Sequence, residues 1–354
     1  MKDKPRVFIF GTNCASVLNS LTIGFEELGI PVKAVSFDFK RSKYNNYSEI
    51  KCICSDNDPG NLKLFFYKLK GLFIVIRYLL WCDVVHIYGN LSKPSFWIIA
   101  MFVKHKFITF VGSDIRMPDK ELAINPYFKY AYYNKEYEYK FEGNNNTPRL
   151  LGFLKRLHYK FIVWDVNIFI DRDIIEKFEI VPHASINMIT NTKGNDPGGQ
   201  KKVLIIHSPT APVAKGSEFV LKAIEKLREK SFSFEFKLLK NLSNEEYQKV
   251  LQKADIYVDQ FIWGAYGIAA QQALQMGKVV VAYLSPERLK IYGNELPIQN
   301  ATINNLAEVL EKLISNDDLR KKIAHQSVSY YEEMHSPKKV ANKMLASYKR
   351  LIQE

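Results

Sequence analysis

Short runs of β-branched and aromatic residues alternate with longer stretches of helical periodicity along the chain. Strands that alternate with helices in this way are typical of α/β proteins with parallel sheets. In the first half the pattern predicts strands at Val7–Gly11, Val32–Asp38, Asp83–Gly89, Phe107–Val111 and Val166–Ile170, and helices at Val17–Leu28, Leu62–Trp81, Trp97–Lys104 and Arg172–Phe178.

The alternation restarts after Asn191–Lys202, a stretch rich in Gly, Asn and Lys that is the best linker candidate. We therefore expect two doubly wound, Rossmann-like domains, 1–190 and 191–354, that face each other across a cleft. In such folds ligands bind at the carboxyl ends of the strands. The second half predicts strands at Val203–Pro209, Phe234–Lys240, Asp255–Phe261 and Lys278–Leu284, and helices at Ser217–Lys230, Asn244–Lys253, Gly267–Met276, Ile303–Ile314, Asp317–Glu333 and Lys338–Gln353.

The composition is sufficient for the hydrophobic cores of two domains, and the charge bears on which class of partner the protein binds. Of the 354 residues, 47% are hydrophobic and 25% are charged, which excludes a disordered or collagen-like chain. The formal net charge of +13 is spread evenly, because residues 1–200 hold 27 basic and 20 acidic side chains and residues 201–354 hold 23 and 17. Nucleic-acid binding favours a concentrated basic patch. We therefore expect no nucleic-acid partner, and an anionic substrate or membrane surface stays open.

Four cysteines, Cys14, Cys52, Cys54 and Cys82, all fall in the first quarter of the chain. They lack the C-x-x-C spacing of zinc or redox pairs, so we expect reduced thiols that pack inside a cytoplasmic protein. The N-terminal stretch MKDKPRVFIFGTN is interpreted as the approach to a strand and not as a signal peptide. No run of about 20 apolar residues is present, so no transmembrane helix is expected.

Two loops of the first half combine small and polar residues directly after an expected strand. Gly11 and Thr12 lie between a strand and a helix N-terminus, a place that suits an anion. A plain tight turn fits them equally well, and the G-x-G-x-x-G spacing of a dinucleotide site is absent. In the second loop, Ser113, Asp114 and Arg116 suit sugar hydroxyls. The alternative there is a capped turn in which Asp114 accepts from backbone N–H groups.

Two loops of the second half suit a phosphate group. Lys215 and Gly216 precede an expected helix, where an ammonium group adds to the positive end of the helix dipole. The turn Gly264-Ala265-Tyr266-Gly267 also enters a helix, whose first amides are free to bind an anion. The alternatives are a solvated lysine at the first place and an ordinary turn at the second.

Taken together, these stretches resemble the retaining glycosyltransferases of the GT-B fold, in the family-4 branch. The resemblance covers nearly the whole chain and rests on DVVHIYG, FITFVGSDIR, the KG of VAKGSEFV and the run GAYGIAAQQALQMGKVVV. It implies an N-terminal acceptor domain and a C-terminal nucleotide-sugar domain, with the last helix, about 338–353, crossing back to the first domain. It also implies sugar transfer with retention and without a metal or other cofactor.

The resemblance assigns roles to single positions. It implies that Lys215 binds and stabilises the donor diphosphate, and that the loop at Gly11 and Thr12 faces the donor diphosphate or the acceptor. The turn Gly264–Gly267 would lie against the donor sugar and phosphates, and Gln272 would face the nucleotide ribose. Ser113, Asp114 and Arg116 remain weaker candidates for the acceptor or sugar.

Three departures from the family pattern bear on catalysis. The family's two glutamates, separated by seven residues, fall here on Gly264 and Gln272, so an amide replaces the carboxylate that normally holds the ribose. The arginine that commonly precedes the lysine is absent, which removes positive charge from the leaving diphosphate. Many members carry His before GSD, where this chain has Val111. His86, inside an expected strand, is another candidate, but a histidine so placed is more often structural.

Two further stretches concern partners. Leu62–Trp81 predicts an amphipathic helix with Lys63, Lys70 and Arg77 along one stripe. We favour a buried helix with a solvated basic stripe over membrane contact. Six tyrosines crowd the stretch 127–139. An insertion over the acceptor side is our hypothesis for them, and a plain packing cluster is the alternative.

The leading hypothesis is a glycosyltransferase, cytoplasmic or at the inner face of the membrane. It moves a sugar from a nucleotide sugar to a cell-envelope glycan or a lipid-linked acceptor, with retention and without a metal. Two D-x-D matches, Asp56–Asp58 and Asp171–Asp173, are interpreted as a surface loop and a helix start. A catalytically silent relative that binds a sugar or serves as a partner subunit is the alternative, and a nucleotide-sugar epimerase is the third hypothesis.

Overall fold

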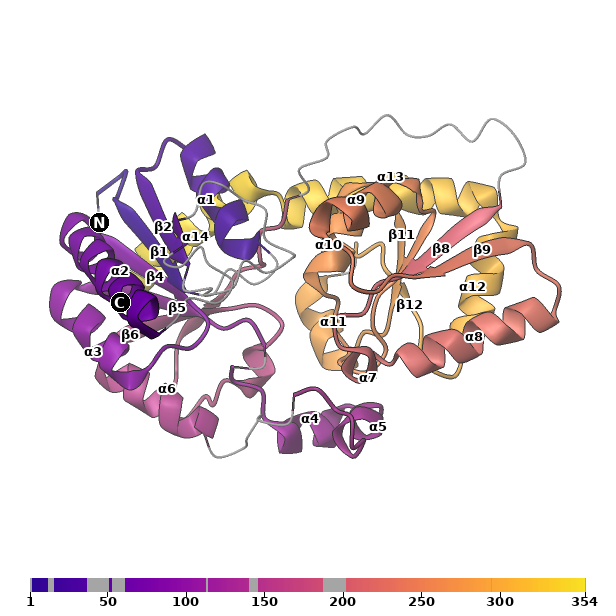
Figure 1. Cartoon of the computed structure of the whole chain (residues 1–354), viewed down its shortest axis with the longest axis horizontal. Helices are drawn as coiled ribbons and strands as arrows, with labels where there is room; N and C mark the ends of the chain where they lie inside the picture. The colour runs from indigo at the N-terminus through magenta and orange to yellow at the C-terminus, as the bar shows by residue number, and fades with distance from the viewer. Residues whose placement is uncertain are drawn as a thin grey trace. The chain divides into compact units, whose positions relative to one another are not determined.

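The chain forms two compact units, shown in Figure 1. Unit 1 consists of Met1–Met117, Glu142–Ser185 and His335–Glu354, and unit 2 consists of Pro118–Phe141 and Ile186–Met334. Each unit is a parallel sheet with flanking helices, which confirms the expected α/β class. The computed structural model describes residues 2–11, 16–36, 51–52, 61–112, 114–139, 146–186, 202–293 and 295–353.

Unit 1 is built on a seven-stranded parallel sheet with the order β3-β2-β1-β4-β5-β6-β7. Strands β1 and β4 are buried along their whole length, as expected for parallel strands covered on both faces. The strands are β1 (Val7–Gly11), β2 (Val32–Ser36), β3 (Lys51–Cys52), β4 (Val84–Tyr88), β5 (His105–Thr109), β6 (Tyr159–Val163) and β7 (Phe178–Ile180). The helices are α1 (Val17–Glu27), α2 (Asn61–Trp81), α3 (Lys93–Phe102), α6 (Asn146–Arg156) and α14 (Pro337–Gln353), with a 3₁₀ turn at Asn167–Phe169.

The C-terminal helix α14 completes unit 1. It packs against α1 so closely that a Cβ added at Gly24 would lie 2.1 Å from the carbonyl oxygen of Pro337. The hydroxyl of Tyr348 on α14 lies 2.6 Å from Nδ1 of His86 on β4, beneath the helix. Glu179 of β7 pairs with Arg350 near the end of α14. Buried packing, a buried hydrogen bond and an ion pair therefore hold α14 to the sheet of unit 1.

Unit 2 is built on a five-stranded parallel sheet with the order β12-β11-β10-β8-β9. Its apolar core lies between the sheet and the helices α8 and α12. The strands are β8 (Val203–His207), β9 (Phe234–Leu238), β10 (Ile256–Val258), β11 (Val279–Ala282) and β12 (Gln299–Asn300). The helices are α4 (Pro118–Ile124), α5 (Phe128–Tyr132), α7 (Pro212–Lys215), α8 (Ser217–Glu229), α9 (Asn244–Lys253), α10 (Ile268–Gln275), α11 (Pro286–Tyr292), α12 (Leu306–Ser315) and α13 (Asp317–Met334).

A strap from the first half of the chain, Pro118–Phe141, belongs to unit 2. The sequence places a single domain boundary at residue 190, whereas the strap groups with unit 2 and His335–Glu354 groups with unit 1. The strap carries the tyrosine-rich stretch, for which we hypothesised an insertion over the acceptor side. Several of its rings pack within unit 2, with Tyr127 edge-on to Tyr283 at 4.7 Å and Tyr137 beside Trp263 at 6.1 Å, whereas Tyr130 and Tyr133 are 48% and 73% exposed. These partners lie more than 120 positions away in the sequence, so local patterns do not reveal them.

Two predicted elements of the first half are wrong. Val166–Ile170 is a 3₁₀ turn and not a strand, because the preceding apolar run, Tyr159–Val163, takes the place beside β5. Arg172–Phe178 is not a helix: Asp171 Oδ1 accepts the N–H of Asp173 at 3.0 Å and closes a turn, and the edge strand β7 follows. The first misreading comes from a short apolar run, which fits more than one place in a sheet or helix.

The favoured interpretation of Leu62–Trp81 is also wrong in one respect. The helix forms as expected, as α2, but much of its apolar surface faces solvent. Phe73 is 71% exposed and Leu80 is 69% exposed, while Val75 and Leu79 on the opposite side reach the core of unit 1. Helical periodicity shows where apolar side chains fall around a helix, but it does not show which of them a neighbouring element covers.

Four buried histidines make the folded state sensitive to acid. Burial lowers the pKa of His183, of His207 to about 4, and of His86 and His335 to about 3. An unfolded histidine has a pKa of about 6.5. As the pH falls from 6.5 towards 4, the unfolded chain therefore binds protons that the folded chain does not, and the free energy of unfolding decreases.

We expect the urea midpoint to fall between about pH 7 and about pH 5, above the range in which carboxylates titrate. Equilibrium unfolding at the two pH values, followed by circular dichroism, measures this. A midpoint that is equal or higher at the lower pH contradicts the burial of neutral imidazoles.

Candidate functional site

The candidate site lies at the carboxyl ends of β8 and β10 in unit 2. The chain leaves β8 at His207 and enters α7 and then α8, with Gly216 between the two helices. It leaves β10 before Asp259 and reaches α10 through Gly267, the N-cap residue. The backbone N–H of Phe261 donates to the carbonyl of Lys215 at 3.0 Å, which ties the two crossings together. Two helix N-termini therefore follow neighbouring strands of the sheet, as ligand sites of α/β folds require.

A buried carboxylate organises this edge of the sheet. Asp259 is fully buried, and its Oδ1 accepts from Nζ of Lys215 at 3.0 Å. Its Oδ2 accepts the N–H of Gly267 at 2.7 Å. The Lys215 side chain is only 15% exposed. The ammonium group and the first amide of α10, both expected to meet an anion, are thus held by one internal carboxylate.

His207 positions the start of α8 beside this pair. It is fully buried, and its ring nitrogens lie 2.8 Å from the carbonyl oxygen of Val258 and 2.8 Å from Oγ of Ser217. Ser217 is the first residue of α8. Burial lowers the pKa of His207 to about 4, so the ring is neutral at neutral pH. Its hydrogen bond to Ser217 links β8 to the start of α8.

Gly264 stands where the resemblance places a glutamate, and the turn has no room for a side chain there. Its φ of 63° lies in the left-handed region, and an added Cβ would sit 2.7 Å from Cβ of Ser285. The carbonyl of Gly264 also accepts the N–H of Ser285 at 2.8 Å. A side chain does not fit at this position unless the loop moves. The shape of the turn therefore requires a glycine where the resemblance places a glutamate.

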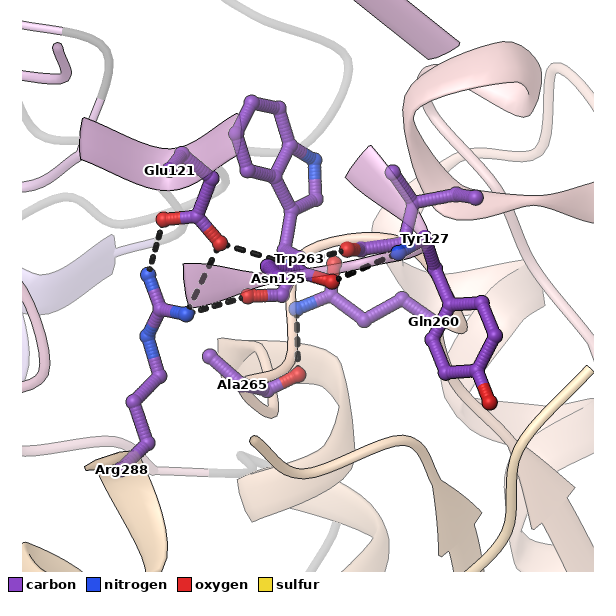
Figure 2. Close-up of polar contacts among 8 residues, drawn as sticks. Glu121, Asn125, Tyr127, Gln260, Trp263, Ala265 and Arg288 are labelled. Atoms are coloured by element: carbon purple, nitrogen blue, oxygen red, sulfur yellow. Dashed lines mark hydrogen bonds and ion pairs between the residues drawn. The ribbon is translucent and has the colours of Figure 1, made fainter. Parts of the chain in front are cut away.

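The strap braces the loop between β10 and α10 from outside, as Figure 2 shows. The guanidinium of Arg288 is paired with both carboxylate oxygens of Glu121, at 3.1 and 2.9 Å, and also donates to the carbonyl of Trp263 at 2.6 Å. Both charged side chains are buried, with 3% and 0% of their surface exposed. A buried pair that also holds a backbone carbonyl fixes the position of the loop that leads to Gly267.

Further contacts hold the same loop. Asn125 of the strap donates to the carbonyl of Ile262 at 2.6 Å, and Gln260 donates to the carbonyl of Ala265 at 2.6 Å (Figure 2). Glu138, near the other end of the strap, accepts the N–H groups of Val213 and Ala214 at the start of α7. The strap thus supports both crossings that form the candidate site.

The other predicted donor residues of unit 2 are largely enclosed. Tyr266 is 3% exposed, with its hydroxyl 3.2 Å from that of Tyr330 and its ring beside Tyr292. Gln272 is 7% exposed on α10, and Ala265 is 6% exposed. Gly267 of this turn lies next to the Lys215 ammonium, since a Cβ added to it would lie 3.9 Å from Nζ.

The predicted residues of unit 1 lie at the ends of its own strands. Gly11 ends β1 with a φ of 145°, and an added Cβ would lie 2.0 Å from the carbonyl oxygen of Tyr88 on β4. Close strand packing therefore requires this glycine, whatever it binds. Thr12 and Ser113 lie outside the described residues.

Asp114 and His86 have internal partners. The carboxylate of Asp114 accepts the N–H of Val111 at 3.1 Å and of Gly112 at 2.8 Å, which is the geometry of the capped turn. Burial raises the pKa of this carboxyl. Arg116 follows it, half-buried. His86 is fully buried, with Nδ1 2.6 Å from the Tyr348 hydroxyl and Nε2 2.8 Å from Oγ1 of Thr109.

Within the described ranges, no group of three or more His, Cys, Asp or Glu side chains is placed to hold a metal ion. In the same part of the chain, no helix combines the length and hydropathy needed to cross a membrane. Burial raises the pKa of the Cys82 thiol to about 12, so this cysteine stays protonated. Cys14, Cys54 and the Asp56–Asp58 match lie outside the described residues.

Sequence reasoning missed Asp259, Glu121 and Glu138. A signal existed for Asp259, because an acid inside the apolar run DIYVDQF must find a partner when it is buried. Glu121 and Glu138 carry no comparable signal, since both lie in a polar stretch that resembles an exposed helix. Their roles depend on Arg288 and on the start of α7, far away in the sequence.

Comparisons with known proteins identify the fold. No family model and no curated protein sequence matches the chain. Solved structures match along nearly its full length. A glycosyltransferase from Rickettsia africae has a TM-score of 0.63 at 14% identity, covering 100% of both chains. Sucrose-phosphate synthase from Thermosynechococcus elongatus has 0.61 at 11%, covering 98% and 99%, and Anabaena HepE in complex with UDP-glucose has 0.59 at 10%, covering 98% and 100%.

These matches cover both sheets, because they extend over nearly the whole chain. The two parallel sheets, each alternating with helices, correspond to two Rossmann-like domains. At 10 to 14% identity, full-length similarity identifies the fold and not the reaction. The chain has the GT-B fold, with two Rossmann-like domains, as its sequence motifs predict.

Proposed function

We propose that the protein is a glycosyltransferase that binds the diphosphate of a nucleotide-sugar donor at the Lys215–Asp259–Gly267 cluster of unit 2. The observation that carries this proposal is the convergence of an ammonium group and two helix N-termini at the carboxyl ends of β8 and β10. Helix N-termini and a lysine favour phosphate groups. They supply positive potential where a diphosphate leaves, without a metal.

Asp259 restricts how a diphosphate can bind, because it already accepts a hydrogen bond from Lys215. An ammonium group has three donor protons, and Asp259 accepts one of them. Displacing the buried carboxylate would leave it unpaired, at a cost of about 3–5 kcal/mol. The donor therefore binds beside Asp259, using the remaining protons of Lys215 and the next amides of α10, while Asp259 keeps the lysine in place.

The remaining assignments extend the same proposal. Gln272 faces the ribose, and the turn Gly264–Gly267 faces the sugar and phosphates. Transfer proceeds with retention, and a phosphate oxygen of the donor accepts the proton of the acceptor hydroxyl. In unit 1, Gly11 and Thr12 face the donor diphosphate or the acceptor, and the loop of Ser113, Asp114 and Arg116 serves the acceptor side. The acceptor is a cell-envelope glycan or a lipid-linked sugar, reached at the inner face of a membrane.

A catalytically silent relative is the second candidate, and two observations favour it. The charge of Lys215 is already balanced by Asp259, and the turn at Gly264 has no room for the carboxylate that the family pattern supplies. A protein of this kind would bind a nucleotide or sugar without turning it over.

We expect one nucleoside diphosphate among UDP, GDP and CDP to raise the thermal unfolding midpoint, because a ligand of the folded state stabilises it. The matching nucleotide sugar should then be hydrolysed slowly without acceptor. The matched control for a Lys215→Ala variant is Lys222→Ala. It removes an exposed lysine of α8 that is paired with Glu218, and it should keep the ligand response.

The outcomes separate the three functions. Release of free sugar and nucleoside diphosphate supports the transferase. Binding without turnover, even with acceptor lipids or glycans present, supports the silent relative. Conversion of the sugar while it remains attached to the nucleotide indicates an epimerase. If none of the diphosphates binds, the proposed donor site is wrong.

A further inference from the structure

Helices α2 and α3 are neighbours in unit 1 (Figure 1), and together they expose a group of large apolar side chains. In the part of the chain that the structure describes, nine of the fourteen exposed large hydrophobic side chains belong to them. Their exposed fractions run from 41% to 76%. We call this surface the apolar face; its residues are Phe65, Phe66, Leu69, Leu72, Phe73 and Leu80 of α2, and Trp97, Met101 and Phe102 of α3.

The apolar face adjoins the side of α2 that packs on the protein and does not overlap it. The buried side is formed by Gly71, Val75 and Leu79, one turn apart. The six exposed apolar positions of α2 fall within about 120° of the helix circumference at about 100° per residue. Scattered apolar residues on a protein surface need no explanation, but a contiguous patch of large ones marks an interaction site.

Positive charge borders the apolar face, and no acid interrupts it. By helical periodicity Lys70 and Arg77 flank it on one side of α2, and both are exposed. Lys68 is also exposed, but it falls in line with Val75 and Leu79. Lys93 and Lys104 stand exposed at the two ends of α3. Neither helix contains an acidic residue.

The nearest acid along the chain does not weaken this charge. Asp83 is the only acidic residue between positions 61 and 104. Its carboxylate is paired with the side chains of Arg6 and Lys2, and these interactions hold the pKa of Asp83 well below its usual range. Over positions 61–104, the surface therefore combines exposed aromatic and aliphatic side chains with a basic border whose one acidic neighbour along the chain, Asp83, is already paired.

We propose that the apolar face is a docking surface for an anionic lipid bilayer. The two helices lie in the plane of the interface, with the apolar side chains at the boundary of the acyl chains and the basic side chains among the lipid headgroups. The proposal stands on the surface itself and holds whatever the acceptor of the reaction is.

Charge favours the bilayer over a second copy of the chain. Two copies joined through this face would bring the same basic residues together, with no acid on either helix to balance them, and like charges brought together repel. A bilayer surface rich in anionic lipids attracts each lysine or arginine near it, by about fivefold in binding, the equivalent of about 1 kcal/mol. Aromatic and aliphatic side chains add the apolar contribution that a purely electrostatic contact lacks.

Co-sedimentation of the full chain with vesicles tests the proposal. We expect binding to vesicles of phosphatidylcholine with phosphatidylglycerol and much weaker binding to phosphatidylcholine alone, and we expect added salt to weaken it. The double variant Phe66→Ser/Phe73→Ser should lose most of the binding. The double variant Lys70→Ala/Arg77→Ala should bind anionic vesicles about 25-fold more weakly, at about fivefold for each charge.

A matched control and a spectroscopic readout separate docking from misfolding. Leu221→Ser/Val328→Ser removes two exposed apolar side chains of unit 2, each 38% exposed, and should bind vesicles as the original chain does. Brominated lipids should quench the fluorescence of Trp97, and Trp97→Phe should remove that quenching. The thermal midpoint and its response to nucleoside diphosphates should stay unchanged in the apolar and basic variants.

Three outcomes would overturn the proposal: equal binding by the original chain and the Phe66/Phe73 variant, no binding to anionic vesicles at low salt, or a dimer in solution that the same variant dissociates. The last identifies a second copy as the occupant. Loss of nucleotide hydrolysis has no bearing on vesicle binding, so failure of the proposed reaction and failure of the docking surface are distinguishable.

Discussion

Replacing Lys215 by alanine is expected to abolish most sugar transfer and to destabilise unit 2. Removing one preorganised donor to a developing negative charge lowers the rate by about 10²–10³-fold. The same change leaves the fully buried carboxylate of Asp259 without its cation. Removing one partner of a buried ion pair costs about 3–5 kcal/mol. Loss of activity in Lys215→Ala alone is therefore ambiguous, because part of it reflects folding.

The double variant Lys215→Met/Asp259→Asn separates the two effects. It replaces the ion pair by neutral side chains of similar size, which is often nearly neutral for stability. The asparagine side-chain oxygen can still accept the N–H of Gly267. We expect its thermal midpoint to return close to the original while transfer and nucleoside diphosphate binding stay lost. Donor turnover at the original rate in either variant would rule out the role assigned to Lys215.

Replacing Glu121 by alanine is expected to lower the free energy of unfolding of unit 2 by about 3–5 kcal/mol. The guanidinium of Arg288 is 3% exposed and would keep the carbonyl of Trp263 as its acceptor without a balancing charge. The loop from Trp263 to Gly267 would lose its brace, so we also expect weaker nucleoside diphosphate binding. Urea unfolding and a titration with the diphosphate found in the thermal screen measure the two effects.

Two further variants make this test specific. Asp119→Ala removes an exposed acid from the same helix, α4, and should leave both quantities nearly unchanged. Glu121→Ala/Arg288→Met removes the pair together and should recover much of the lost stability. If Glu121→Ala unfolds at the original urea concentration, the strap does not hold the loop as the geometry indicates.

The two expected results depend on residues that sequence reasoning treated very differently. Lys215 stands before a glycine and a helix, so its position predicts a phosphate-binding role. Nothing local shows that a buried aspartate 44 positions later holds its ammonium group. Glu121 resembles an exposed helix residue, and only the folded chain pairs it with Arg288, 167 positions away. The Lys-Gly motif predicts that Lys215 binds phosphate. The burial and the charged partners of Lys215 and Glu121 depend on contacts between residues that are distant in the sequence.

The same distinction applies to the fold. Strands such as Val7–Gly11 and Val203–His207 are long, apolar and bounded by turns, and the structure has them within the predicted ranges. The segment 159–180 was misread because two short apolar runs compete for one place in the sheet, and pairing with β5 decides between them. A local pattern does not contain the partner strand.

By itself, the sequence determined the alternation of strands and helices, and hence two parallel sheets, because period and turn chemistry are local properties of the backbone. It also determined where glycines permit tight turns at the strand ends. Only the tertiary structure decided that the strap joins unit 2, that Asp259 holds Lys215, and that α2 leaves its apolar side uncovered. Each of these depends on which distant surfaces meet, and burial, which sets the cost of every charge and apolar side chain, exists only once they have met.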